Sequence, residues 1–189
     1  MFKDLERNVE KLGSNNVIGA IVGEQESMSI PSDFSTEHDK NIKSIDTFQV
    51  GDADSSQQDA IQLSKRNVSF VLQGPPGTGK SQTITNIIAE AIADGKKVLF
   101  VSEKMAALQV VYNRLANVGL ANFCLTLHSH KANKKEILQE LDKSISATHT
   151  KVKDDILSEL DILEKKRDEL NDYQEELHTK TSGLNVSIY

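Results

Sequence analysis

The stretch that decides the fold is Val68-Ser69-Phe70-Val71-Leu72-Gln73, followed directly by Gly74-Pro75-Pro76-Gly77-Thr78-Gly79-Lys80-Ser81. The first six residues form a short run rich in β-branched and aromatic side chains, which predicts a strand. The next eight match the pattern Gly-x-x-x-x-Gly-Lys-Ser, the Walker A phosphate-binding loop. Glycines let such a loop turn tightly and bring backbone N–H groups close to phosphate oxygens.

The segment after the loop completes the predicted phosphate site. From Gln82 to Ala93 apolar residues recur at helical spacing, and Asp94-Gly95 ends the pattern. A helix that begins near Lys80 presents unpaired N–H groups and a positive dipole end to the phosphates. Lys80 and Ser81 are the candidate catalytic residues: Lys80 is expected to reach the β and γ phosphates, and the Ser81 hydroxyl to bind Mg²⁺. The candidate ATP-binding residues in this stretch are Gly74, Pro75, Pro76, Gly77, Thr78, Gly79, Lys80, Ser81 and Gln82.

Strand and helix patterns alternate on both sides of the loop. A helix is expected over Ser56–Ser64, a second strand over Val98–Val101, a second helix over Ala106–Val118 and a third strand over Phe123–Leu127. This order predicts an α/β P-loop fold with a parallel sheet and right-handed crossovers. Cys124 falls inside the third strand and is expected to be a small core residue.

The two ends of the chain differ from this centre. The N-terminal flank, residues 1–50, is expected to contain a helix over Met1–Leu12, a strand over Val17–Val22 and a polar loop from Glu24. Residues 51–130 are expected to form a partial P-loop ATPase domain. Residues 131–189 are expected to form a helical insertion, with helices over Lys131–Ser146 and Asp154–Lys180.

A narrow apolar stripe marks the last predicted helix. Its members follow steps of 4, 3, 7 and 7 and are Ile156, Leu160, Leu163, Leu170 and Leu177. Arg167 and Gln174 stand at the alternate positions of this heptad-like seam. The pattern therefore predicts a helical hairpin or stalk rather than a long autonomous coiled coil.

Composition and charge narrow the class of protein. The 189 residues carry a net charge of −6, which argues against a module that binds nucleic acid through bulk positive charge. The segment from Val101 to Thr150 has 6 basic and 4 acidic residues, so it alone offers phosphates a favourable field. A single cysteine, no secretory signal pattern and no apolar run of about 18 residues predict a cytoplasmic chain without a membrane span.

Four blocks in fixed order resemble superfamily 1 helicases. They are Asp54-Ser55-Ser56-Gln57-Gln58-Asp59-Ala60-Ile61, the Walker A loop with Gln82-Thr83-Ile84, Val98-Leu99-Phe100-Val101-Ser102-Glu103-Lys104-Met105-Ala106-Ala107-Leu108, and Leu127-His128-Ser129-His130-Lys131-Ala132-Asn133-Lys134-Lys135. More narrowly, they are similar to large bacterial helicase-like proteins that carry an AAA-type ATPase domain. The resemblance covers about residues 52 to 141, and it implies the first part of a RecA-like motor domain.

The resemblance assigns further candidate residues. Gln57 stands where the Q motif is expected, so its side-chain amide is implied to bind the adenine edge, with one donor and one acceptor. Its neighbour Gln58 is the alternative adenine-binding residue. A further alternative is that Gln57 is an ordinary surface glutamine at the start of a helix.

Candidate contacts to single-stranded nucleic acid follow two of the predicted strands. They are Ser102 and Lys104 in motif Ia, and His128, Ser129 and Lys131 after the third strand. Both groups are expected at the carboxyl edge of the sheet, where open α/β sheets bind ligands. An ordinary loop with solvated side chains is the alternative for each group. A metal site formed by His128 and His130 is not expected, because no further ligand lies nearby.

The residues for ATP hydrolysis are incomplete. The family places a Walker B Asp-Glu pair after an apolar strand, but Asp154-Asp155 and Asp168-Glu169 both lie in charged sequence. We therefore expect the front part of a motor domain, which binds ATP and lacks efficient turnover without Walker B, the arginine finger and a second motor domain. A nucleotide-dependent switch or assembly ATPase of AAA type, which binds protein partners through its charged helices, is the alternative function. A third possibility is a purely structural role for the helices from Asp154 onward.

Overall fold

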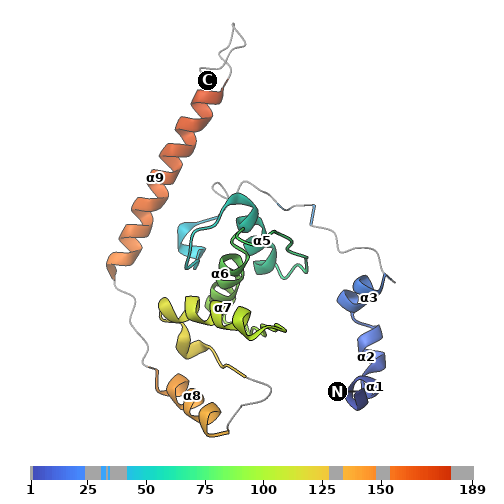
Figure 1. The fold of residues 1–189 in the computed structure, drawn as a ribbon. Helices are drawn as coiled ribbons and strands as arrows, with labels where there is room; N and C mark the ends of the chain where they lie inside the picture. The colour runs from blue at the N-terminus through green and yellow to red at the C-terminus, as the bar shows by residue number, and fades with distance from the viewer. Residues whose placement is uncertain are drawn as a thin grey trace.

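A computed structural model describes residues 2–23, 31–32, 34, 42–127, 134–147 and 154–179 (Figure 1). Its helices, in chain order, are α1 Phe2–Arg7, α2 Val9–Gly13, α3 Asn16–Val22, the 3-10 turn η1 Ser44–Asp46, α5 Ser55–Lys65, α6 Lys80–Ala93, α7 Met105–Asn117, the 3-10 turn η2 Ala121–Phe123, α8 Lys134–Ser146 and α9 Asp154–His178. None of these helices combines the length and the apolar character required to cross a lipid bilayer.

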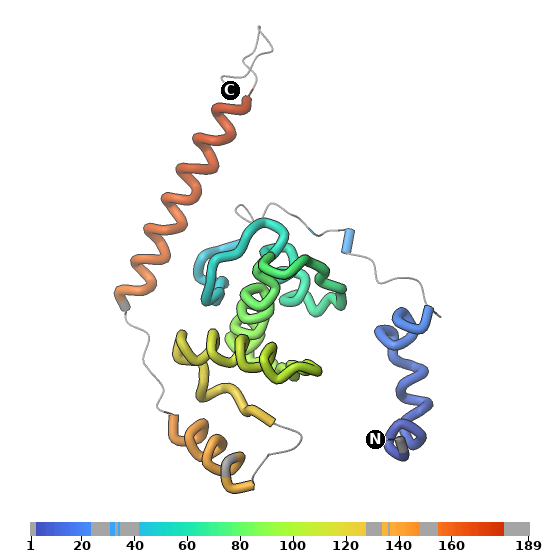
Figure 2. Tube along the Cα trace, in the orientation of Figure 1, coloured from blue at the N-terminus to red at the C-terminus, as the bar shows by residue number. Residues whose placement is uncertain are grey.

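Helix α6 is the centre of the described fold. It packs against α5 on one side and α7 on the other (Figure 2). Ile88 of α6 joins Val111 and Leu115 of α7 in a buried apolar cluster, and partly buried side chains including Cys124 surround it. On the α5 side, Ile61 is 0% exposed. The helix that follows the phosphate loop is thus held on two faces.

Apolar periodicity predicted the helices of this centre correctly. The expected helices over Ser56–Ser64, Gln82–Ala93 and Ala106–Val118 correspond to α5, α6 and α7. Helix α5 begins where the Asp54 side chain accepts a hydrogen bond from the Gln57 N–H, 2.9 Å away. The expected N-terminal helix is present as α1 and α2, which are interrupted at Asn8.

The strand expected over Val17–Val22 is wrong, because these residues form helix α3. The side chain of Asn15 accepts hydrogen bonds from the N–H groups of Val17 at 3.0 Å and Ile18 at 3.2 Å. This N-cap satisfies two donors that a helix start otherwise leaves unpaired. A strand here would lack a neighbouring strand in the described residues, so the cap outweighs the β propensity of Val17, Ile18, Ile21 and Val22.

The three expected strands around the core are not formed in the described part of the chain. Val68–Gln73, Val98–Val101 and Phe123–Leu127 carry no ladder of backbone hydrogen bonds to one another, and Phe123 ends η2 instead. Val71 and Leu99 are each 86% exposed. A strand pairs its backbone with a neighbour at about 4.8 Å, and these segments have no such neighbour among the described residues.

The C-terminal helices lie at their expected positions in the sequence. They do not pack into a closed hairpin in the described residues. Helices α8 and α9 are separate bodies that do not pack side by side in the described residues (Figure 1). Helix α9 contacts η1, where Arg167 Nη1 donates a 2.6 Å hydrogen bond to the carbonyl of Ile42. Apolar residues of its predicted stripe, including Leu163 and Leu170, are exposed. The hairpin or stalk in which this stripe would be covered stays a prediction.

Candidate nucleotide-binding site

The phosphate loop ends at the first turn of α6, as its sequence predicts. Gly79 is the residue before the helix and has φ +75°, ψ +10°, a left-handed conformation that strongly favours glycine. No side chain caps this helix start. Its N–H groups therefore meet the physical requirement for binding an anion, together with the positive end of a 14-residue helix.

The ammonium of Lys80 lies over the loop itself. Lys80 Nζ donates a hydrogen bond to the carbonyl of Gly74 and another, of 2.6 Å, to the carbonyl of Pro75. These carbonyl oxygens are acceptors in the same sense as phosphate oxygens. A bound triphosphate would compete for this cation with a stronger, charged acceptor.

Close contacts shape the rest of the loop. The Thr78 hydroxyl donates a 2.8 Å hydrogen bond to the carbonyl of Pro75, which folds the loop back on itself. A Cβ at Gly74 would lie 2.6 Å from Thr78 Oγ1, so this close approach requires glycine. The local geometry thus explains the glycines at two positions of the motif, Gly74 and Gly79.

The structure brings Gln57 against the loop from another helix. Gln57 Nε2 donates a 3.2 Å hydrogen bond to the carbonyl of Thr78, 21 residues away in sequence. Its alternative, Gln58, is engaged elsewhere, since its Oε1 accepts a 2.7 Å hydrogen bond from Gln49. Of the two candidate adenine-binding residues, Gln57 therefore lies at the nucleotide loop.

Ser81 and Gln82 lie on the first turn of α6 with different surroundings. Ser81 immediately follows Lys80. Mg²⁺ bound to a nucleotide typically keeps few protein ligands beside phosphate and water, so the single hydroxyl of Ser81 is enough to fit such an ion. In the described residues no group of three or more His, Cys, Asp or Glu could form a separate metal site. Gln82 Nε2 donates to the carbonyl of Asp52 and so lies against another segment.

The candidate nucleic-acid residues are only partly described. Ser102 Oγ accepts a 3.3 Å hydrogen bond from the Lys104 N–H, a local turn that leads into α7. Lys104 is exposed, and no salt bridge to it occurs in the described ranges. His128, Ser129 and Lys131 lie outside the described residues.

Neither acidic pair on α9 has the surroundings of a Walker B site. Asp168 and Glu169 have side chains that are 63% and 66% exposed, and Glu169 pairs with Lys166 at 2.8 Å. That carboxylate is the main reason why the pKa of Lys166 is raised. Asp155 is exposed at the start of the same helix. A magnesium-binding carboxylate would be expected at the end of a buried strand.

One group of residues near the site was missed by the sequence analysis. Three polar side chains of α6, named here the polar row, hold a segment named here the strap, residues 46–52. The row consists of Gln82, Asn86 and Glu90, which bond to the strap backbone at Asp52, Gly51, Val50 and Phe48. The available signal was the spacing of four residues between Gln82, Asn86 and Glu90 along the helix.

Comparisons with known proteins relate the chain to a family and to several longer proteins. The family model described as "AAA domain" matches residues 52–187. The chain is 49% identical over 72 residues to "Uncharacterized ATP-dependent helicase MG140" of Mycoplasma genitalium, covering 38% of this chain and 6% of that protein. It is 36% identical over 126 residues to the MG140 homolog of Mycoplasma pneumoniae, covering 66% of this chain and 11% of that protein.

A more distant relative comes from an animal. The chain is 38% identical over 72 residues to "DNA-binding protein SMUBP-2" of Rattus norvegicus, covering 37% of this chain and 7% of that protein. The chain thus spans about a tenth or less of the length of these relatives. No solved structure matches it.

The geometry of Gly79 predicts the effect of a substitution. Gly79→Ala would adopt a left-handed conformation and place its Cβ 2.6 Å from Gln57 Nε2. We expect about a five- to a hundredfold rise in the dissociation constant for Mg-ATP, because backbone and Gln57 must both shift and such strain costs about 1–3 kcal/mol. Isothermal titration calorimetry measures the change.

Gly95→Ala is the matched control for this prediction. Gly95 has φ +69°, and nothing lies within 4 Å of the added Cβ. The control should lose similar stability in thermal unfolding but keep its affinity for Mg-ATP. Equal affinity losses in the two variants would assign the effect to general destabilisation.

Proposed function

The chain belongs to the AAA domain family and is a superfamily 1 helicase motor-domain region, and from this premise we propose that it is the ATP-binding part of an ATP-dependent helicase acting on nucleic acid. The observation that carries the proposal is the joint position of Lys80 and Gln57 at one loop. The first is bonded to the carbonyl of Pro75 and the second to the carbonyl of Thr78. A triphosphate and a base could thus be recognised on the two sides of the same turn.

Each residue has a proposed role in holding Mg-ATP. The Lys80 ammonium leaves its carbonyl partners and donates to the β and γ phosphates, while the N–H groups at the start of α6 bind the phosphate oxygens. Ser81 offers its hydroxyl to Mg²⁺, which would neutralise phosphate charge. Gln57 binds the adenine edge. Among the described residues, the buried carboxylate of Glu90 is engaged by Lys65 and by the Phe48 N–H. No described carboxylate follows a buried strand, so binding without efficient turnover is proposed.

The remaining assignments are also proposals. Ser102, Lys104, His128, Ser129 and Lys131 are proposed to contact a single strand of DNA or RNA, and a second motor domain is proposed to complete the ATP site. Residues 131–189 are proposed to form a helical insertion or stalk.

A cytoplasmic location is also proposed. The single Cys124, whose thiol pKa is raised by burial, has no partner for an intramolecular disulfide, which supports this location.

Binding and turnover of ATP test the central role of Lys80. We expect the chain to bind Mg-ATP, and Lys80→Ala to weaken binding by about ten- to a hundredfold, since hydrogen bonds to charged groups contribute about 1.5–3 kcal/mol. Lys97→Ala, which removes an exposed lysine away from the loop, should bind as the wild type does. Calorimetry measures affinity, and phosphate release measures turnover. Robust turnover that disappears in Lys80→Ala would refute the proposed lack of hydrolysis.

Nucleic-acid binding separates the helicase role from the alternative. Helix α9 carries ten acidic and three basic side chains besides His178, together with exposed apolar residues, and this surface favours the AAA-type switch that binds protein partners. We expect single-stranded oligonucleotides to bind at low salt and to dissociate as salt rises, because phosphate contacts release counterions. ATP-driven assembly without any single-strand binding would instead support the switch.

The parallel sheet is proposed to form when its neighbouring strands are present. The exposed apolar side chains of Val71, Leu99 and Val101 support it, because burial between sheet and helices would remove them from water. In a chain extended to the length of its relatives, amide hydrogen exchange over Val98–Val101 should slow by at least about a hundredfold, since core strands open with free energies near the global value. Ile88 in α6 should be protected in both chains. Rapid exchange over Val98–Val101 in the longer chain would contradict the sheet.

A further inference from the structure

The strap, residues 46–52, lies along one side of α6. The polar row that holds it consists of residues at positions i, i+4 and i+8 of the helix, and this spacing puts Gln82, Asn86 and Glu90 on one face. Helix α6 therefore carries the phosphate loop at its first residue, an apolar face against α7, and this polar face against the strap.

The polar row binds backbone groups of the strap at successive points. Glu90 Oε1 accepts a 2.9 Å hydrogen bond from the Phe48 N–H. Asn86 Oδ1 accepts from the N–H groups of Val50 at 3.1 Å and Gly51 at 3.0 Å, and Asn86 Nδ2 donates to the Gly51 carbonyl at 2.9 Å. A shift of the strap by one residue along α6 would break these bonds together.

Burial makes this register costly to change. Asn86 is 0% exposed and Glu90 is 1% exposed. A buried carboxylate or amide that loses its partners bears a large desolvation penalty, whereas apolar side chains would tolerate sliding. The polar row therefore fixes the position of the strap in a way that apolar packing would not.

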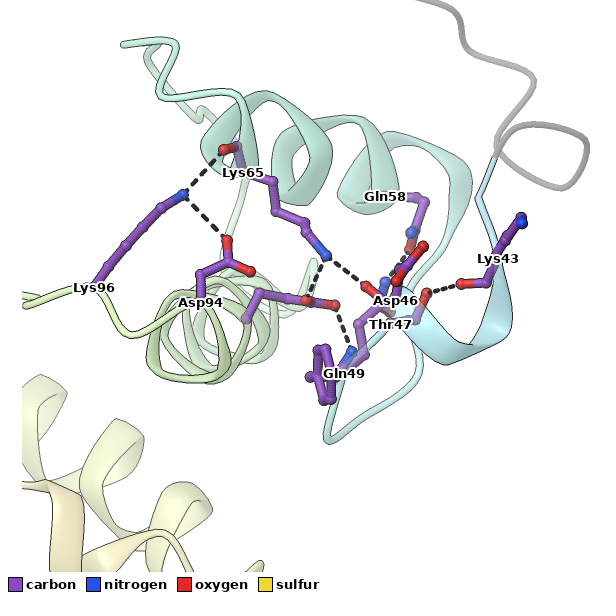
Figure 3. Close-up of polar contacts among 10 residues, drawn as sticks. Lys43, Asp46, Thr47, Gln49, Gln58, Lys65, Asp94 and Lys96 are labelled. Atoms are coloured by element: carbon purple, nitrogen blue, oxygen red, sulfur yellow. Dashed lines mark hydrogen bonds and ion pairs between the residues drawn. The ribbon is translucent and has the colours of Figure 1, made fainter. Parts of the chain in front are cut away.

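A lysine of α5 closes the network (Figure 3). Lys65 Nζ lies 2.8 Å from Glu90 Oε2 and donates a 2.6 Å hydrogen bond to the carbonyl of Asp46. Lys96 Nζ in turn donates to the carbonyl of Lys65 at 3.0 Å and pairs with Asp94 at 3.2 Å. The ammonium of Lys65, the last residue of α5, thus joins the buried carboxylate of α6 to the first residue of the strap.

The strap leads directly into the residues that place Gln57. Asp54 follows the strap and caps α5, and its carboxylate accepts the Gln57 N–H. Helix α5 is consequently held relative to α6 at both ends, by Lys65 at its last residue and by the strap before its first. Gln57 lies on α5, and Lys80 begins α6.

We propose that Asn86 and Glu90 are positioning residues for base recognition, which fix Gln57 at the distance from the phosphate loop that adenine requires. They touch no part of the nucleotide and act through the strap and α5. This inference rests on the proposed function, in which Gln57 binds adenine and Lys80 binds the phosphates. It predicts that loss of the polar row weakens base recognition and leaves phosphate binding intact.

The test compares two ligands on the whole chain. Calorimetry with Mg²⁺ gives dissociation constants for ATP and for inorganic tripolyphosphate. The ratio of interest is the tripolyphosphate constant divided by the ATP constant. It measures how much the nucleoside strengthens binding, and it falls when base recognition is lost. Gln57→Ala sets the ratio expected when base recognition is lost. Asn86→Ala should bring the ratio to within about threefold of that value, with the tripolyphosphate constant changed less than about twofold.

A double variant shows whether Asn86 acts through Gln57. In Gln57→Ala/Asn86→Ala the ratio should fall no further than in Gln57→Ala, because coupled residues are not additive. Thr85→Ala is the control on the same helix: its buried hydroxyl bonds to the Ser81 carbonyl and not to the strap, so its ratio should equal that of the wild type.

A second substitution covers the case in which Asn86→Ala does not fold. Glu90→Gln keeps an acceptor for the Phe48 N–H but removes the charge opposite Lys65, and it should lower the ratio by a smaller factor. An unchanged ratio in folded variants, or parallel losses of both ligands, would overturn the positioning role. A wild-type chain that binds tripolyphosphate and ATP equally would instead refute adenine recognition by Gln57, and one that binds neither would refute the proposed ATP site.

Discussion

The buried carboxylate of Glu90 is the contact on which the described fold around the loop depends. It accepts the Phe48 N–H and pairs with Lys65, so strap, α5 and α6 meet at one group. A carboxyl side chain that is 1% exposed is stable only with such partners. Because α6 begins at the phosphate loop, the same carboxylate links the position of Gln57 to that of Lys80.

The proposed site gives α6 two roles. Its first turn would supply the N–H groups and the cation that a triphosphate requires, while its later turns hold the segment that leads to the proposed adenine-binding residue. Gln57 on α5 and Lys80 on α6 would thus be held at one loop by the same helix.

Sequence reasoning was reliable where the determinants are local. The loop at Gly74–Ser81 and helices α5, α6 and α7 follow from motif and periodicity within a few residues. The contacts of Asn86 and Glu90 could not be predicted, since their partners lie 25 to 42 residues away and depend on tertiary packing. The strand over Val98–Val101 also depends on distant neighbours, and the described residues supply none. The strand predicted at Val17 was wrong because the Asn15 side chain caps a helix there, and this cap outweighed the apolar run.

The most direct measurement is a crystal structure of this chain with Mg²⁺ and a non-hydrolysable ATP analogue. It should show Lys80 Nζ within about 3.2 Å of a β- or γ-phosphate oxygen, released from the Pro75 carbonyl, with the adenine edge at the Gln57 amide and the strap still bonded to Asn86. A nucleotide bound away from Gly74–Ser81, or bound there while Lys80 stays on the Pro75 carbonyl, would contradict the account.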